Sequence, residues 1–130
     1  MNSYRPLILA HGGAGSRRIT RAQAACLADA IAAGYSILAQ GGSALAAVES
    51  TIGLLEQSGL FNAGLGANRQ LDGAQRMDAA IMEGAHLKAG AIASVEGIVH
   101  PISAARLVLE ETNHVLLVGP FAGKFSRHFK

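Results

Sequence analysis

With 130 residues, half of them apolar, the chain has room for one modest domain with a packed core. Sixteen glycines against few aromatic residues predict close backbone packing and exclude an intrinsically disordered chain. The net charge is only +2 and most of the basic residues are scattered along the chain, so the sequence does not favour a nucleic-acid partner. The single cysteine, Cys26, cannot form an internal disulfide. With no convincing targeting or membrane-spanning segment, we expect a cytoplasmic protein.

The N-terminal region predicts a strand followed by a glycine turn. Residues 6–10 are consecutively apolar, which is typical of a short strand buried on both faces. The segment His11-Gly12-Gly13-Ala14-Gly15 follows directly. Its glycines do not match the spacing of a dinucleotide-binding fingerprint. Two interpretations stay open: a tight turn leaving a central strand, or a backbone that approaches a ligand closely.

Two amphipathic helices are predicted next. Thr20 begins the first helix, with Gln23 as its capping-box partner, and Gly41-Gly42 ends it. Ser43 is a plausible N-cap for the second helix. Each helix has one apolar face expected to lie in the core, and the two faces comprise Leu27, Ile31, Tyr35 and Leu38, and Leu45, Val48, Ile52 and Leu55. The short glycine connection predicts one antiparallel helical layer.

The segment from Leu55 to Ala67, here called the 55–67 loop, is the strongest candidate for a site. It runs from a helix end through closely spaced glycines and carries one amide side chain, Asn62, between Phe61 and Ala63. Loops that need special backbone angles and hold a polar group beside apolar neighbours more often serve a site than a core.

Residues 76–82 and 88–98 predict two antiparallel strands joined through residues 83–86. Asp78 lies inside the first strand, and an ionised carboxylate in a buried strand needs partners. It is interpreted either as a structural carboxylate bonded to backbone amides or as a support beside the site.

The C-terminal part predicts a helix and one more strand. Pro101 suits the first position of a helix that ends near residues 112–113, and residues 114–118 are apolar enough for a buried strand. Residues 119–124 (GPFAGK) do not have the spacing of a phosphate-binding loop. The five histidines show no metal-like pairing, and no serine nucleophile motif is present. The residues therefore predict an α+β fold, helices packed on a sheet, with a candidate site that lacks a nucleophile.

Five motifs in this order resemble the N-terminal subunit of plant-type L-asparaginase/isoaspartyl peptidases, which are N-terminal-nucleophile hydrolases. The resemblance covers about residues 6–119. The motifs are His11-Gly12-Gly13-Ala14-Gly15, Leu55-Glu56 with Leu60-Phe61-Asn62-Ala63-Gly64-x-Gly66-Ala67, Met77-Asp78-Ala79-Ala80-Ile81-Met82-x-Gly84, Leu87-Lys88-Ala89-Gly90-Ala91, and Pro101-Ile102-Ser103-Ala104-Ala105-Arg106.

This resemblance implies that residues 1–130 are a single-domain fragment, the N-terminal α half of a four-layer αββα sandwich. A separate β subunit from the same precursor completes the domain in this family, and the assembly is an (αβ)2 heterotetramer. Family precursors cut themselves before a threonine, which becomes the nucleophile and, through its α-amine, the base. The implied reaction is hydrolysis of the L-asparagine side-chain amide or of isoaspartyl dipeptides, without a catalytic cofactor. Thr20, Thr51 and Thr112 neither begin the chain nor follow a glycine, so the nucleophile is expected in the second subunit.

The resemblance also implies residue roles. Asn62 matches the asparagine that orients the nucleophilic threonine, and Gly12 and Gly13 match a glycine segment beside it. Gly59 stands where proline is common in the family. A structural sodium ion is implied on the backbone carbonyls of Leu55, Glu56, Ser58, Phe61, Ala63 and Leu65, consistent with the preference of hard cations for oxygen.

Two alternatives remain from the sequence. The chain could belong to a glycosylasparaginase-like or threonine-aspartase-like relative in the same superfamily. It could also be a non-catalytic binding or scaffold domain whose glycines serve only as turns.

Overall fold

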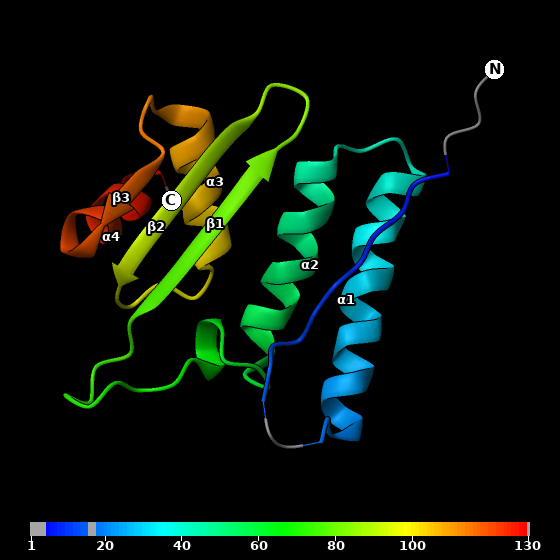
Figure 1. The fold of residues 1–130 in the computed structure, drawn as a ribbon, viewed down its shortest axis with the longest axis horizontal. Helices are drawn as coiled ribbons and strands as arrows, with labels where there is room; N and C mark the ends of the chain where they lie inside the picture. The colour runs from blue at the N-terminus through cyan, green and yellow to red at the C-terminus, as the bar shows by residue number, and fades with distance from the viewer. Residues whose placement is uncertain (1–4, 16–17, 130) are drawn as a thin grey trace.

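The computed structural model describes residues 5–15 and 18–129, and within them the chain is α+β as predicted (Figure 1). The elements in chain order are α1 (Arg21–Ala39), α2 (Ala44–Ser58), a 3-10 turn η1 (Gly64–Gly66), β1 (Met77–Glu83), β2 (Lys88–Val95), α3 (Pro101–Glu111), β3 (Leu116–Val118) and α4 (Gly119–His128).

The first two helices form the predicted antiparallel pair, and their predicted caps are confirmed. The Thr20 hydroxyl accepts a hydrogen bond from Gln23 N, and the Ser43 hydroxyl accepts one from Ala46 N, each 3.1 Å long. These caps satisfy backbone groups that the first helical turn leaves unpaired.

The predicted apolar faces of the two helices are wrong in part. Tyr35 and Val48 are 45% and 39% exposed, whereas the residues buried along the seam include Ala30, Gly34 and Ala47. Gly34 leaves no room for a side chain beside Thr51. Small residues let the helix axes approach, so larger side chains are displaced to the flanks of the seam.

The length and composition of α1 would also allow it to cross a membrane, contrary to the expectation that no segment comes close. The core helix of a non-membrane protein meets the same test, and here α1 packs along α2. The length and composition of α1 therefore do not by themselves distinguish a membrane span from a core helix.

The sheet has the order β1-β2-β3. The predicted hairpin is confirmed: β1 and β2 are antiparallel, with Ala80 opposite Ala91, and the pairing is irregular between Met77 and Ala79. The second strand ends at Val95, earlier than predicted. β3 pairs with β2 in the parallel direction, and α3 connects these two strands, as parallel pairing requires.

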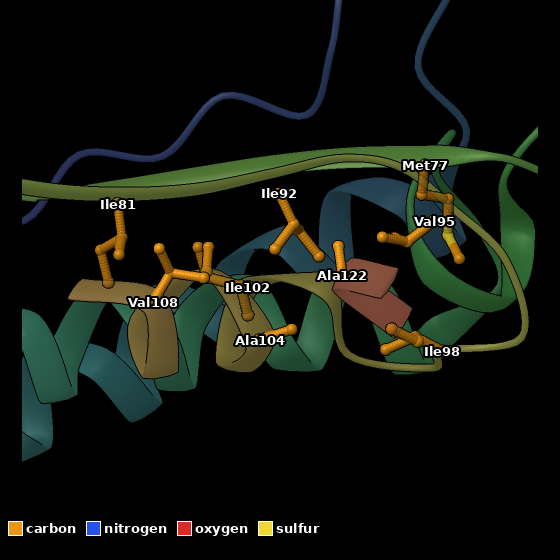
Figure 2. Close-up of a cluster of buried hydrophobic side chains, with 10 residues drawn as sticks. Met77, Ile81, Ile92, Val95, Ile98, Ile102, Ala104, Val108 and Ala122 are labelled. Carbon is orange, nitrogen blue, oxygen red and sulfur yellow. The ribbon is translucent and has the colours of Figure 1, made fainter. Parts of the chain in front are cut away.

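The main core lies between one sheet face and α3 (Figure 2). Ile81 and Ile92 point from the sheet toward Val108 and Ile102 of α3, and Ala122 of α4 belongs to the same cluster. The helix was predicted correctly from Pro101 and its apolar face.

The opposite face of the sheet is open and apolar. Because side chains alternate along a strand, the neighbours of Ile92 in β2, Ala91 and Ala93, point away from α3. Their partners in β3 are Leu116 and Val118, which are about half exposed. Met82 of β1 is also largely exposed. The prediction that residues 114–118 form a buried strand is therefore wrong: only residues 116–118 are a strand, and one side of it is uncovered.

Two other predictions need correction. Residues 6–10 are not a strand; they run along the α1–α2 pair, with Leu7 and Leu9 78% and 84% exposed (Figure 1). A strand buried on both faces needs a sheet to lie in and a layer on each side of it. None of the described strands pairs with this segment. Residues 119–124, left without an element, begin α4, because Pro120 suits the first turn of a helix.

Candidate functional site

The glycine segment near the N-terminus meets the 55–67 loop. A Cβ atom added to Gly12 would lie 2.8 Å from Cε1 of the Phe61 ring, so the ring packs directly on the glycine backbone. Gly13 N donates a hydrogen bond of 3.0 Å to Nδ1 of His11. Two motifs that are far apart in sequence thus form one local structure. The structure shows neither of the two interpretations of this glycine segment, a turn leaving a central strand or close approach to a ligand or another main chain; the contact of Gly12 is with a side chain.

The 55–67 loop is closed against the end of α2. Gly59 ends the helix in the left-handed conformation, with φ of 68°, which glycine adopts without strain. Gly64 packs against the backbone of Glu56 so closely that no Cβ would fit. The hydroxyl of Ser58 donates to the carbonyl of Leu55 at 2.7 Å. The loop is therefore a compact body attached to α2.

Asn62 lies exposed on this loop, and its side chain has one hydrogen-bond partner among the described residues. Its Oδ1 accepts from Asn68 N at 2.8 Å, which orients the amide and leaves the two N–H groups of Nδ2 available. Asn62 lines a hollow of about 240 Å³ together with Glu56, Arg76 and Asp78. The geometry suits donation of a hydrogen bond to a group entering this hollow.

The side chain of Glu56 is buried and makes contacts that the sequence did not reveal. Its side chain is 4% exposed; Oε1 accepts from Ile102 N at 3.0 Å, and Oε2 lies 3.5 Å from Nδ1 of His100. Burial raises the pKa of Glu56 to about 7, although the hydrogen bond from Ile102 acts in the opposite direction and the charge of Glu49 adds to the rise. One sequence signal pointed to such a contact. His100, which precedes Pro101, is not a usual N-cap residue, so the start of this helix needs an acceptor from elsewhere.

The structure supports the interpretation of Asp78 as a structural carboxylate bonded to the backbone. Its Oδ1 accepts a hydrogen bond of 2.7 Å from Ser94 N across the irregular part of the β1–β2 pair. The residue is exposed rather than buried, because it points to the open face of the sheet. It also lines the hollow that contains Asn62.

Arg76, which sequence reasoning missed, lines this hollow together with Asn62 and Asp78. Its Nη1 lies 2.7 Å from Oδ2 of Asp72, and its Nε lies 2.8 Å from Oε1 of Glu96. The hydrogen bond with Asp72 is the main cause that raises the pKa of Arg76. A guanidinium with two carboxylate partners is held in place.

The backbone carbonyls assigned to sodium by resemblance all lie on the closed loop. Several already accept one hydrogen bond, from Ser58 Oγ to Leu55 O, from Ala63 N to Phe61 O and from Gly66 N to Ala63 O. A carbonyl oxygen has two lone pairs, so these bonds leave room for a cation. The described residues contain no group of three or more side-chain metal ligands. An ion held by these carbonyls would have only neutral oxygen ligands, the donor atom that hard cations prefer.

The described threonines have structural partners. Thr20 caps α1, the Thr51 hydroxyl donates to Ala47 O at 2.8 Å, and the Thr112 hydroxyl donates to Val108 O at 2.8 Å. Cys26 is half-buried at the edge of a small core cluster. The hollow beside Asn62 has no serine, threonine or cysteine among its described lining residues.

Comparison with known proteins shows the family of this chain. A protein-family model described as Asparaginase matches residues 4–130. The chain belongs to the asparaginase family. It is 49% identical over 123 residues to a plant-type L-asparaginase of Pyrococcus abyssi, an alignment that covers 92% of this chain and 40% of that protein.

Two further relatives of this asparaginase-family chain have other names. An isoaspartyl peptidase/L-asparaginase of Xenopus laevis is 42% identical over 125 residues, covering 95% of this chain and 40% of the relative. An isoaspartyl peptidase of Salmonella typhimurium is 43% identical over 129 residues, covering 92% and 41%. The chain thus spans about two fifths of the length of these relatives.

Proposed function

We propose that this chain is the α subunit of an autoproteolytically matured threonine hydrolase that acts on the L-asparagine side-chain amide, on isoaspartyl dipeptides, or on both. The second subunit comes from the same precursor and supplies an N-terminal threonine. That hydroxyl attacks the amide carbonyl, the amine leaves, and water then releases the acyl group from the threonine ester.

The observation that carries this proposal is the contact between Gly12 and Phe61. It brings the N-terminal glycine motif to the loop that holds Asn62, beside a hollow whose described lining has hydrogen-bonding groups but no nucleophile. In the proposed enzyme the Nδ2 donor of Asn62 orients the incoming threonine. The hydrogen bond from Asn68 N holds the amide in the required orientation before the threonine arrives.

A second subunit is supported by the apolar surface that this chain leaves open. Leu116, Val118 and Met82 are exposed on one sheet face, and residues 6–10 are extended without a partner strand among the described residues. Uncovered sheet faces and unpaired strand edges attract further chain. We propose that the second subunit covers them to form the four-layer αββα sandwich, and that two such pairs assemble into the heterotetramer.

The proposal includes a sodium ion with a structural role. The carbonyls of Leu55, Glu56, Ser58, Phe61, Ala63 and Leu65 would hold it, and the ion would supply positive charge that stabilises the loop carrying Asn62. No chemical step of the hydrolysis requires it.

The test uses the full-length protein, with intact-mass measurement, N-terminal sequencing and assays on L-asparagine and β-aspartyl dipeptides. We expect two chains, the second beginning with threonine, and loss of hydrolysis when that threonine is replaced by alanine. An uncleaved protein, or a second chain beginning with a residue other than Thr, Ser or Cys, would refute the proposal. Activity on glycosylated asparagine with none on dipeptides would instead identify the glycosylasparaginase-like relative.

A further inference from the structure

Gln23 uses both ends of its side-chain amide. Its Oε1 accepts a hydrogen bond of 3.0 Å from Thr20 N in the capping box that begins α1. Its Nε2 donates a hydrogen bond of 2.9 Å to the backbone carbonyl of Leu60 in the 55–67 loop. The capping box accounts for the first bond but not for the second.

The bond from Gln23 to Leu60 restrains the backbone two residues before Asn62. Leu60 N donates to the Ser58 hydroxyl at 3.1 Å, so both backbone groups of Leu60 have partners, one inside the loop and one on α1. Leu60 directly precedes Phe61 and Asn62 in the chain. The position of Leu60 therefore sets where the backbone enters the part of the loop that presents the amide of Asn62.

Other hydrogen bonds do not set that position relative to α1. The partner of Asn62 is Asn68, directly after the loop, and the partner of Ser58 is Leu55 at the end of α2, so neither bond reaches α1. Among the described residues, Gln23 donates the one side-chain hydrogen bond that joins α1 to the loop. Apolar packing also restrains this side: Phe61 packs on Gly12 and shares a buried cluster with Ala30 of α1.

We infer that Gln23 is a positioning residue. Its capping bond orients the side-chain amide so that Nε2 binds the Leu60 carbonyl. This bond holds the loop, and with it Asn62, in place beside the Gly12–Gly13 segment. This inference rests on the proposed function for its catalytic consequence. The contact itself can be tested without any activity.

The decisive variant is Gln23→Glu. A carboxylate keeps an acceptor for Thr20 N and therefore preserves the capping box, but it cannot donate to the Leu60 carbonyl. Ser43→Ala is the matched control, because it removes the N-cap hydrogen bond of α2 without touching Gln23 or the loop. Both variants should lose a similar, small amount of thermal stability.

Two measurements on the full-length protein separate the variants. In Gln23→Glu we expect amide hydrogen exchange in residues 57–67 to rise about fivefold, as loss of one ordinary hydrogen bond implies, and not in Ser43→Ala. We also expect kcat to fall about tenfold with KM unchanged, because only the orientation of the reacting groups is affected. The kcat deficit of Gln23→Glu should shrink as the pH falls, since protonation of the introduced carboxylate restores an O–H donor.

Each outcome is decisive. Unchanged loop exchange in Gln23→Glu overturns the inference whether or not the protein is active. Faster exchange with an unchanged kcat overturns the positioning role. An inactive wild-type protein counts against the proposed function instead, and the exchange result then decides by itself whether Gln23 holds the loop.

Discussion

The buried carboxylate of Glu56 accepts a hydrogen bond of 3.0 Å from the backbone nitrogen of Ile102, and so the end of α2 caps the beginning of α3. The N-cap position of α3 is His100, whose side chain makes no capping bond. An acceptor at the N-terminus of a helix satisfies a backbone N–H that has no partner within the helix. Glu56 thereby links the helix that carries the 55–67 loop to the helix beneath the sheet.

The first prediction concerns this capping contact and pH. The pKa of Glu56 is raised to about 7 by burial, so the folded state holds a proton that the unfolded chain releases near the ordinary value of 4.5. The stability contribution of the neutral form is complete below about pH 4.5 and is lost as the pH rises toward 7. Urea unfolding across this range should show a decline of about 2–3 kcal/mol attributable to Glu56.

The variant that checks this is Glu56→Gln. Its amide oxygen still accepts from Ile102 N, but the side chain does not ionise, so we expect the decline between pH 4.5 and about 7 to become smaller. Above that range, at about pH 8, the variant should be more stable than the wild-type protein. An identical pH dependence in the two proteins would contradict the raised pKa.

The second prediction concerns Gly12. Gly12→Ala places a Cβ where Cε1 of Phe61 lies only 2.8 Å away, and it should slow maturation and cost about 1–3 kcal/mol by overpacking. Gly15→Ala is the control, because no atom of the described residues beyond its chain neighbours lies within 4 Å of its Cβ position. Phe61→Leu should partly rescue Gly12→Ala by vacating the contact. Equal behaviour of the two alanine variants in cleavage and unfolding assays would argue against the contact.

The third prediction separates the two ends of the Asn62 amide. Asn62→Asp keeps the oxygen that accepts from Asn68 N but lacks the N–H donors. We expect both Asn62→Asp and Asn62→Ala to slow self-cleavage and turnover by an amount equivalent to about 1–3 kcal/mol, the cost of losing a hydrogen bond at a site that the second subunit covers in the proposed enzyme. The two variants should differ in loop stability, because only Asn62→Asp retains the bond to Asn68. A normal cleavage rate in Asn62→Asp would exclude an orienting role for the amide nitrogen.

The fourth prediction concerns the helical seam. Gly34→Ala would overlap the Thr51 hydroxyl and place a Cβ 2.6 Å from Cδ1 of Ile8, so it should destabilise the fold by about 1–3 kcal/mol. Gly53→Ala in α2 has only Nδ1 of His100 within 4 Å, at 3.9 Å. It should instead stabilise the helix by about 0.5–1 kcal/mol. Thermal unfolding of the pair measures both effects, and the same sign for both would refute the close packing of α1 on α2.

The fifth prediction concerns sodium. If the carbonyls of the 55–67 loop hold this ion, exchanging sodium salts for choline salts at constant ionic strength should lower Tm and loosen the loop, and sodium should restore both. A ligand that binds the folded state and not the unfolded chain raises the free energy of unfolding, so removing it lowers Tm. A Tm that is insensitive to the cation would speak against the site.

Local sequence signals were enough to predict much of the fold. The capping pair Thr20 and Gln23, the N-cap Ser43 and the helix start at Pro101 act within one helical turn, and the β1–β2 hairpin forms between neighbouring segments. Such signals are legible because the interacting atoms are close in the chain. The resemblance of five short motifs to the asparaginase family likewise required only their order, and the match over residues 4–130 agrees with it.

Tertiary structure decided what depends on distant partners. Residues 6–10 and 116–118 are as apolar as buried strands, but their exposure depends on which chain segments lie beside them, and a pattern within one segment does not contain that information. The same reason explains why Glu56 was assigned only a backbone role: its carboxylate caps a helix 46 residues further along. The sequence by itself determined the first three helices, the β1–β2 hairpin and the family, because these signals are local. Packing between distant segments determined which faces are covered and brought Gly12 to the loop of Asn62.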